Sequence, residues 1–379
     1  MYRRIAVAVL LSLGLGAVRA QDDGFKSLFN GKDLSGWVNV NCAPSTWYVK
    51  DNMIITTGKP TGYLRTDRMY ENFVLEFDWF HAPEPKGAVG NSGLFVWGDP
   101  IPAVGTGYTR SIEVQVLVNL LYKDKKGNPT ATSHGDLFSI WGAKCKPDRP
   151  HPAGSERCLP SENVCKGEYE WNHYRVTANN GVLKLAVNGK DVSGVTESNP
   201  RKGFLALESE GSECRFKNIK IKELPSTNPK ASEICDEDKG FTCLFTGLDL
   251  NGWKATDMHK KHWIMRDGVL NCDGKATYAT ASLATEKSFG NFELICDFKS
   301  KASLILNPGG AGKAISLEAT GKGWSRALVR VQGNGVSVSI NGKGVSDLKL
   351  DKAPTAGPIA LRQQGEATQF RNLFIRELK

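Results

Sequence analysis

Several features are missing from this 379-residue sequence, and each absence excludes a class of protein. Apart from residues 5–15 it has no long apolar run, so it is not a protein that crosses a membrane several times. Its 40 glycines follow no G-X-Y period, which excludes a collagen-like chain. The formal net charge is +9, but basic and acidic residues are interleaved, so we expect no nucleic-acid partner. No window predicts an amphipathic helix longer than two turns.

The N-terminal residues have the pattern of a secretory signal peptide. Two arginines precede the apolar residues 5–15, and the small residues Val18 and Ala20 stand just before Gln21. The apolar run is shorter than the roughly 20 residues that span a bilayer. No cysteine follows the expected cleavage site, which argues against a lipoprotein anchor. We expect residues 1–20 to be removed, leaving a secreted or periplasmic protein with no membrane span.

Nine cysteines are an odd number, so in an exported protein at least one thiol is free or pairs between chains. Cys145, Cys158 and Cys165 lie in one loop-like stretch, where we expect a local disulfide. Cys235 and Cys243 flank a short polar segment and are a second expected pair. A zinc site formed by the three loop cysteines and a nearby histidine is the alternative, but no C-x2-C pair supports it.

The chain contains two copies of one unit. The offset between matching segments falls from 219 to 154 residues, so the second unit lacks 65 residues that the first has in its middle. We therefore expect a first domain at 21–224, a linker at 225–240 and a second domain at 241–379. The matching segments are 25–37 with 241–253, 71–79 with 290–298, and 216–224 with 370–378.

Both units are predicted to consist of short β-strands. Their apolar residues alternate with polar ones or form short β-branched and aromatic runs, as in residues 72–79, 92–98 and 111–118. Asn-Gly dipeptides are typical of tight hairpin turns, because type I′ turns need positive φ at both central residues. Each unit is thus predicted to be a β-sandwich of jelly-roll type. The dipeptides are Asn180-Gly181, Asn188-Gly189, Asn334-Gly335 and Asn341-Gly342.

The strand predicted at 111–118 carries the first candidate site residues. Alternation places Glu113 and Gln115 on the face opposite its Ile and Val side chains, which pack into the core. In a curved jelly roll that opposite face is often a substrate cleft, although it can also be an ordinary solvent face. Sequence alignment of the two units places Ser316 and Glu318 at the corresponding positions of the second.

Two further predicted strands contribute candidate sugar contacts. In 91–99, alternation puts Trp97 and Asp99 in register; aromatic rings stack on sugars and carboxylates bond their hydroxyls. In 205–211, Glu208 and Glu210 share a face, and of these we expect Glu208 to bind substrate.

The segment HGDLFSIWGAK at 134–144 belongs to the part that the second unit lacks, so the scaffold does not need it. It supplies a candidate catalytic histidine, His134, and candidate substrate contacts at Asp136, Trp141 and Lys144. Two of them could instead be structural residues: His134 a loop histidine that bonds the backbone, and Trp141 an ordinary core tryptophan.

Seven motifs of the first unit together resemble the 3-keto-disaccharide hydrolase family, and the second unit resembles a shortened copy. The resemblance implies tandem concanavalin-like jelly-roll sandwiches and cleavage of glycosides that carry a ketone at C3. The partner is then a carbohydrate. The motifs are LFNGKDLSGW, NSGLFVWG, IEVQVL, HGDLFSIWGA, EWNHYRV, VNGK and FKNIKIKEL.

A ketone at C3 acidifies the C2 proton, so a base can start elimination of the C1 substituent; hydrolysis is the alternative route. Glu113 or His134 is the expected base, with Gln115 beside them in the catalytic set. A divalent cation, the one cofactor considered, or Lys144 would stabilise the enolate. The sequence lacks the E-x-D-x-x-E pattern of retaining jelly-roll glucanases. The competing hypothesis is a non-catalytic carbohydrate-binding or cell-envelope protein.

Overall fold

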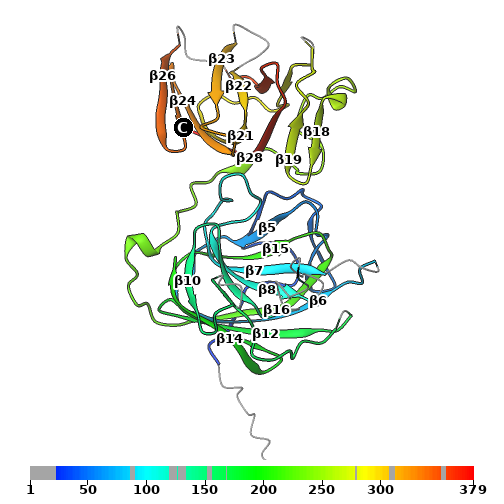
Figure 1. Cartoon of the computed structure of the whole chain (residues 1–379), viewed down its shortest axis with the longest axis vertical. Helices are drawn as coiled ribbons and strands as arrows, with labels where there is room; N and C mark the ends of the chain where they lie inside the picture. The colour runs from blue at the N-terminus through cyan, green and yellow to red at the C-terminus, as the bar shows by residue number, and fades with distance from the viewer. Residues whose placement is uncertain are drawn as a thin grey trace, which may run out of the picture.

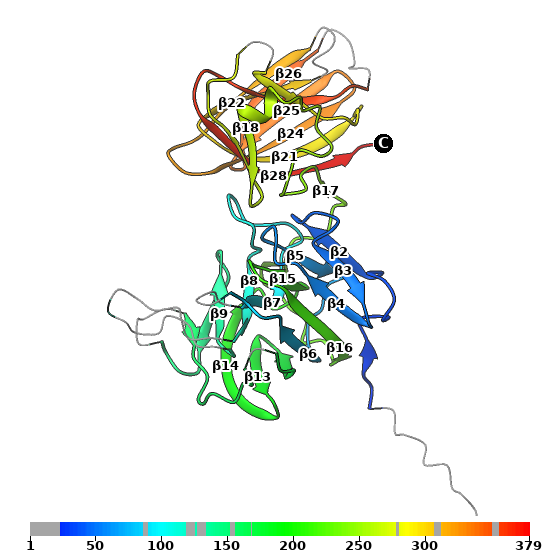
Figure 2. The ribbon, with the colours of Figure 1, turned by 90° about the vertical axis from the view of Figure 1, so that its right-hand side faces the viewer.

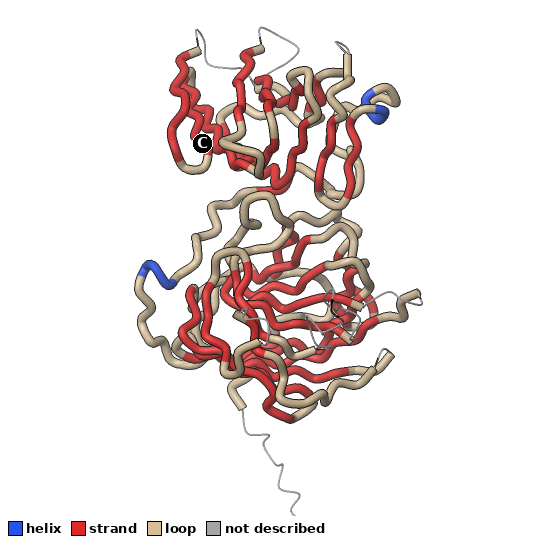
Figure 3. The backbone as a smooth tube through the Cα atoms, in the orientation of Figure 1, coloured by secondary structure: helices blue, strands red, loops and turns tan. Residues whose placement is uncertain are grey.

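The computed structural model describes residues 23–85, 90–118, 126, 134–151, 156–167, 169–277, 280–306, 312–350 and 356–379. The predicted signal peptide, residues 1–20, lies outside these residues. Within them the chain forms β-strands and two short 3-10 turns, η1 (Ala231–Glu233) and η2 (His259–Lys261) (Figure 3). None of the helices described is long and apolar enough to cross a membrane. The prediction of an all-β fold is confirmed.

The first sandwich pairs two sheets of antiparallel strands (Figures 1 and 2). One sheet has the order β10(Lys144–Pro147), β14(Lys190–Asn199), β13(Val182–Val187), β12(Asn172–Asn179), β6(Phe73–His81), β16(Cys214–Glu223), β4(Met53–Thr56), β3(Trp47–Lys50), with β1(Lys26–Ser27) beside β16. The facing sheet has the order β11(Arg157–Cys158), β9(Leu137–Ile140), β8(Ser111–Leu117), β7(Asn91–Gly98), β15(Phe204–Ser209), β5(Gly62–Thr66), β2(Trp37–Val40). We call this second one the cleft sheet.

The second sandwich repeats the arrangement with shorter sheets. Its larger sheet has the order β18(Trp263–Arg266), β19(Val269–Cys272), β28(Thr368–Glu377), β21(Phe292–Lys299), β24(Ser325–Gln332), β25(Gly335–Ile340), β26(Lys343–Lys349), with β17(Thr242–Cys243) beside β28. Its smaller sheet has the order β20(Ser282–Ala284), β27(Ile359–Gln363), β22(Lys301–Leu306), β23(Lys313–Glu318). In the described residues, this smaller sheet ends at β23, whereas the cleft sheet continues past β8 into β9 and β11. Part of the 65-residue difference between the units therefore forms the additional strands β9 and β11.

Each sandwich has its own apolar core because its strands alternate in burial. In β8, Ile112, Val114 and Val116 pack into the core of the first sandwich, as their alternation predicts. A separate core in the second sandwich contains Phe298 and Phe370. The two predicted tandem jelly-roll sandwiches are confirmed.

Of two hairpins that contain an Asn-Gly dipeptide, one has the predicted turn and the other turns one residue earlier. Asn180 and Gly181 have φ of 49° and 75°, the positive pair that a type I′ turn needs. Between β24 and β25 the turn instead uses Gly333 and Asn334, because Gln332 pairs directly with Gly335. Gly333 alone has positive φ, 56°, so glycine occupies the first central position of the turn.

The predicted disulfides are wrong: all nine cysteines are free thiols. The Cys235 thiol points to the carbonyl of Trp97 in the first sandwich, with 3.0 Å between Sγ and O. The Cys243 thiol contacts the carbonyl of Phe245 instead, at 3.4 Å. The two sulfurs are therefore held by different parts of the fold. The cysteines of the 145–165 loop are free as well.

Candidate active site

A cleft of about 420 Å³ lies on the outer face of the cleft sheet, over β7, β8 and β15. Side chains of the insert and of the loop between β7 and β8 form its walls. Its lining consists of Asn91, Tyr108, Glu113, Gln115, Phe138, Ile140, Trp141, Arg157, Glu208 and Glu210. The cleft therefore brings together four of the residues expected from the sequence: Glu113, Gln115, Trp141 and Glu208.

Glu113 and Gln115 enter the cleft because β8 turns its aliphatic side chains inward. They are only 6% and 5% exposed, so they do not form an ordinary solvent face. The Gln115 amide donates to Asn91 Oδ1 at 2.7 Å and to the Ser92 carbonyl at 3.3 Å. These bonds fix the orientation of Gln115 next to Glu113.

Gly93 lets two carboxylates approach each other across β7. β7 runs between β8 and β15, and a Cβ placed on Gly93 would lie 3.0 Å from Glu113 Oε1 and 2.8 Å from Glu208 Oε2. A side chain at this position would push at least one carboxylate away. The glycine of the NSG segment therefore has a direct role in shaping the cleft.

Burial makes these carboxylates hold protons. It raises the pKa of Glu113 to about 8, with a contribution from the charge of Glu210. Burial also raises the pKa of Glu208 well above its usual range, helped by the charges of Glu210 and Glu113. In the described part of the chain, neither carboxylate oxygen of Glu208 has a hydrogen-bond donor. A ligand that supplies a donor would satisfy it.

Glu210 is the carboxylate of the cleft that is best able to carry a negative charge. It accepts hydrogen bonds from the Tyr108 hydroxyl at 2.7 Å and from the amide of Asn91. Burial raises its pKa, but the Tyr108 bond opposes that shift. The cleft thus combines two carboxyl groups whose pKa burial raises strongly with a third, Glu210, whose rise in pKa is opposed by hydrogen bonds, and this arrangement suits acid–base chemistry.

The cleft lining includes aromatic rings and one cationic side chain, Arg157. Trp141, 52% exposed, stacks on Tyr108 with ring centroids 6.3 Å apart and planes 13° from parallel. Arg157 lies 3.6 Å from the ring centre of Phe138 and pairs with Asp136 at 2.6 Å. Asp136 is buried and does not line the cleft itself; it holds Arg157 there.

The expected position of Trp97 in the cleft is wrong. A β-bulge interrupts the alternation: the register of β7 against β15 shifts between Phe204 and Ala206, and Trp97 has φ of 57°. The ring of Trp97 therefore turns into the core, where it is fully buried and donates to the Glu71 carbonyl.

Three other expected residues lie elsewhere. Asp99, beyond the bulge, accepts two hydrogen bonds from Arg110, at 2.8 and 2.9 Å. His134 is buried, and its Nε2 accepts from the Cys165 backbone at 3.2 Å. Lys144 is exposed on β10, which belongs to the sheet opposite the cleft sheet. None of the three lines the described cleft.

Sequence reasoning missed several cleft residues for different reasons. Glu210 shares a face with Glu208 and was named beside it, but only Glu208 was expected to bind substrate. Asn91 belongs to a motif already noticed, but its role depends on the Gln115 contact. Tyr108 and Arg157 lie in irregular stretches without periodicity, so only the tertiary structure places them.

Among its described residues, the second sandwich has no carboxylates at the positions of Glu113, Glu208 and Glu210. Arg362 lies 154 residues after Glu208, the offset of the C-terminal repeat, and it pairs with Ser303 of β22, so Ser303 takes the position of Gly93. By the same register, Ala314 and Ser316 take the positions of Glu113 and Gln115, which corrects the Ser316 and Glu318 expected from sequence. Arg362 and Gln364 take the positions of Glu208 and Glu210.

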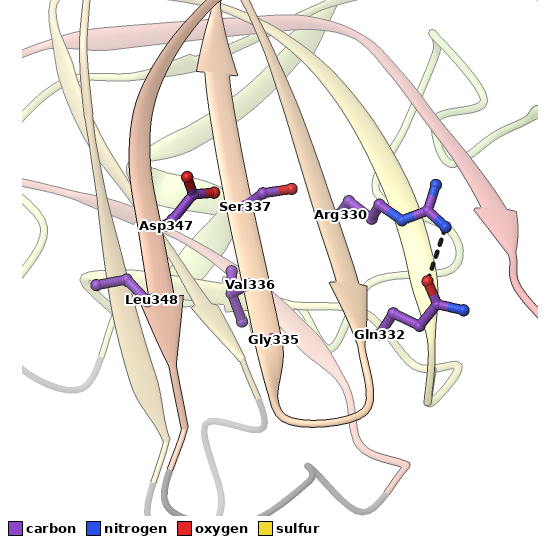
Figure 4. A pocket seen from close by; sticks show the side chains of 7 residues that line it. All are labelled: Arg330, Gln332, Gly335, Val336, Ser337, Asp347 and Leu348. Atoms are coloured by element: carbon purple, nitrogen blue, oxygen red, sulfur yellow. Dashed lines mark hydrogen bonds between the residues drawn. The ribbon is translucent and has the colours of Figure 1, made fainter.

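In two other hollows of the described chain, charged side chains are already paired or lie apart from one another. One of about 490 Å³ lies between the sandwiches, where Arg376 is already paired with Glu293. The other, about 250 Å³, lies on β24, β25 and β26; there Arg330 bonds to Gln332, and these two side chains lie apart from Asp347 (Figure 4). Among the residues described, no group of three or more His, Cys, Asp or Glu side chains is arranged to hold a metal ion.

The fold and the cleft define a tandem jelly-roll protein with a carboxylate-lined site in its first sandwich. The chain belongs to the family of the 3-keto-alpha-glucoside-1,2-lyase-like domain. The family model matches residues 24–222, 240–318 and 312–376, so it covers both sandwiches. The resemblance seen in the sequence, with two copies of which the second is shortened, is confirmed.

Solved structures similar to this chain include three of different description. A "putative glycosyl hydrolase" from Parabacteroides distasonis ATCC 8503 is 22% identical over 53% of this chain and 94% of its own, with a TM-score of 0.41. The carbohydrate-binding module CBM66 from Bacillus subtilis is 12% identical over 50% and 96%, with a TM-score of 0.34. The VIP36 exoplasmic/lumenal domain in a Ca²⁺/Man-bound form is 10% identical over 52% and 87%, with a TM-score of 0.37. No curated protein sequence matches the chain.

Proposed function

We propose that this protein cleaves glycosides oxidised to a ketone at C3, by elimination across C1 and C2, in the cleft of the first sandwich. The observation that carries the proposal is the pair of buried carboxyl groups, Glu113 and Glu208, that converge over Gly93. Membership in a family named for a 3-keto-alpha-glucoside-1,2-lyase supports the same substrate class. Export from the cytoplasm, inferred from residues 1–20, is part of the proposal.

The reaction needs a base, an acid and a group that stabilises negative charge. Ionised Glu113 takes the C2 proton, and the C2–H electrons form an enolate with the C3 carbonyl. The enolate then collapses to the C3 ketone, which forms the C1–C2 double bond as the C1–O bond breaks. The leaving oxygen takes a proton from Glu208, whose raised pKa keeps it protonated. Arg157 lines the cleft, and we assign its guanidinium to the enolate oxygen. Addition of water to the unsaturated product would complete a net hydrolysis.

The structure changes which residues we assign to these roles. His134 drops out as the base, because its ring is buried and Nε2 is held by the backbone of Cys165. Lys144 drops out as the enolate partner, because it lies on the opposite sheet. Gln115 becomes a positioning and substrate-binding amide.

The test is to incubate the purified chain with a 3-keto disaccharide and, separately, with the unoxidised disaccharide, with and without divalent cations. We expect release of the leaving sugar and formation of an unsaturated ketone, detected by its ultraviolet absorbance, only from the oxidised compound. No cleavage of either sugar under any condition would contradict the proposal. Tight binding without turnover would favour the competing hypothesis of a carbohydrate-binding protein.

Replacement of Trp141 by alanine should weaken substrate binding with little effect on folding. Trp141 is half exposed and stacks only on Tyr108, so its removal leaves the core intact. Loss of one aromatic contact, worth about 0.5–1.5 kcal/mol, corresponds to a KM higher by about 2- to 12-fold. Steady-state kinetics and thermal melting measure the two effects. Trp171→Ala, just before β12 of the opposite sheet and in contact with Phe80, is the matched control and should leave KM unchanged.

A further inference from the structure

The loop at 99–110, between β7 and β8 of the first sandwich, is held by side chains of the second. Asp297 of β21 accepts a hydrogen bond from the Gly105 backbone N–H at 2.8 Å. Asn372 of β28 donates to the Thr106 carbonyl at 2.9 Å and to a second carbonyl of the loop at 3.2 Å. Arg326 of β24 donates to a third loop carbonyl at 2.8 Å. The contacts are to backbone atoms, so they fix the path of the chain.

These side chains form a buried set, which together with Trp324 we call the loop anchor. Asp297 and Asn372 are 0% and 1% exposed, and Arg326 pairs with Asp297 at 2.6 Å. Gly105 has φ of 73°, and a Cβ on it would lie 2.2 Å from the Trp324 ring. Only glycine fits this contact, because any side chain would collide with the ring and strain the backbone.

The anchored segment leads directly into the cleft. Tyr108 follows it, and its hydroxyl donates to Glu210 at 2.7 Å while its ring stacks on Trp141. The ring also packs against an apolar cluster shared by both sandwiches, to which Phe95 of the first and Phe374 of the second contribute. The second sandwich thus reaches the cleft through the segment that carries Tyr108.

The first sandwich has its own side chains at the positions that correspond to the loop anchor. There Asp78 takes the place of Asp297, accepting from Asn218 at 2.6 Å and bonding His173 Nδ1 at 2.7 Å. The side chain of His173 is 44% exposed. Both copies therefore contain the Asp–Asn pair. The second copy differs in two ways: Arg326 stands where the first has His173, and the loop at 99–110 packs on the pair.

We propose that the second sandwich is a positioning domain for the cleft: its loop anchor fixes residues 102–107 and so holds Tyr108 against Glu210. The shortened repeat has lost its own carboxylates, yet it supplies the surface that the cleft wall needs. The position of Tyr108 does not depend on the reaction, whereas the kinetic consequence rests on the proposed function.

Hydrogen exchange measured by mass spectrometry tests the positioning without any substrate. In Asp297→Ala, amides of the 99–110 peptide should exchange at least about tenfold faster than in the wild type, because their anchor is lost. Asp78→Ala removes the equivalent aspartate of the first sandwich and is the matched control; it should leave that peptide unchanged. Because Asp297→Ala removes a buried ion-pair partner, Gly105→Ala provides a second route. It disturbs the same contact from the loop side and should give the same result. Unchanged exchange in Gly105→Ala, or equal effects of Asp297→Ala and Asp78→Ala, would overturn the proposal.

Kinetics on the 3-keto substrate test the consequence for catalysis. Asp297→Ala and Tyr108→Phe should each lower kcat by about 10- to 100-fold with a smaller change in KM. The first displaces and the second removes the hydroxyl that donates to Glu210, whose charge acts on both Glu113 and Glu208. The double variant should be little worse than Tyr108→Phe alone, since both changes affect one contact. Losses that multiply would show that the second sandwich acts independently of Tyr108 and would overturn the kinetic claim. If the wild type has no activity, the proposed function fails, while hydrogen exchange still decides the positioning.

Discussion

The Glu113→Gln variant is expected to lose about 10³-fold in kcat on a 3-keto disaccharide while remaining folded. Glutamine keeps the shape of the side chain but cannot take the C2 proton, so the step that starts the elimination is removed. The variant should still bind substrate, because Gln115, Arg157 and Trp141 are unchanged. Initial-rate kinetics with the oxidised disaccharide, together with thermal melting, measure both quantities.

Glu162→Gln is the matched control for this change. Glu162 is an exposed glutamate of the first sandwich that pairs with Lys190 outside the cleft. It should retain the wild-type rate, because surface ion pairs contribute little. If the Glu113→Gln variant keeps a rate within a few fold of the wild type, Glu113 has no role in the mechanism.

Activity and stability should respond to pH in opposite directions. The value of kcat/KM should rise with pH and level off above about 8, because Glu113 has a pKa of about 8 and acts as a base only when ionised. The free energy of unfolding should fall over the same range. Unfolding returns Glu113 to an ordinary pKa, so between about 4.5 and 8 the folded state binds more protons than the unfolded state. Stability conferred by the protonated group is therefore lost as pH rises through this range.

Denaturant unfolding of the wild type and of Glu113→Gln at pH 5 and pH 9 isolates this effect. The variant lacks the titrating group, so its stability relative to the wild type should increase from pH 5 to pH 9, by an amount on the order of a few kcal/mol. The Glu162→Gln control should show no such trend. A variant whose relative stability is independent of pH would mean that Glu113 titrates normally in the folded protein. A rate that falls from pH 6 to pH 8 would contradict its role as a base.

Parts of the site could be predicted from the sequence because they depend on local periodicity. Alternation in β8 is uninterrupted, so the side on which Glu113 and Gln115 lie follows from the Ile and Val residues between them. The same reasoning placed Glu208. It failed for Trp97, where one bulged residue reverses the alternation, since a shift of one position exchanges the two faces of a strand.

Residues in irregular segments could not be placed by the same means. Arg157 and Tyr108 reach the cleft from stretches whose path is set by contacts made far along the chain. Tyr108 depends on Asp297 and Asn372, which are 189 and 264 residues away in the sequence. Cysteine spacing was equally unreliable, because pairing depends on the distance between side chains and not on the number of residues between them.

The sequence by itself determined the duplication, the all-β class and the family, because these rest on repeated motifs and on the period of side-chain alternation. The tertiary structure decided which polar groups share one cleft, which pKa values burial shifts, and how the second sandwich supports the first. These properties depend on distances between segments that are remote in the chain, and on how far each charge is removed from water. Neither quantity is a property of local sequence.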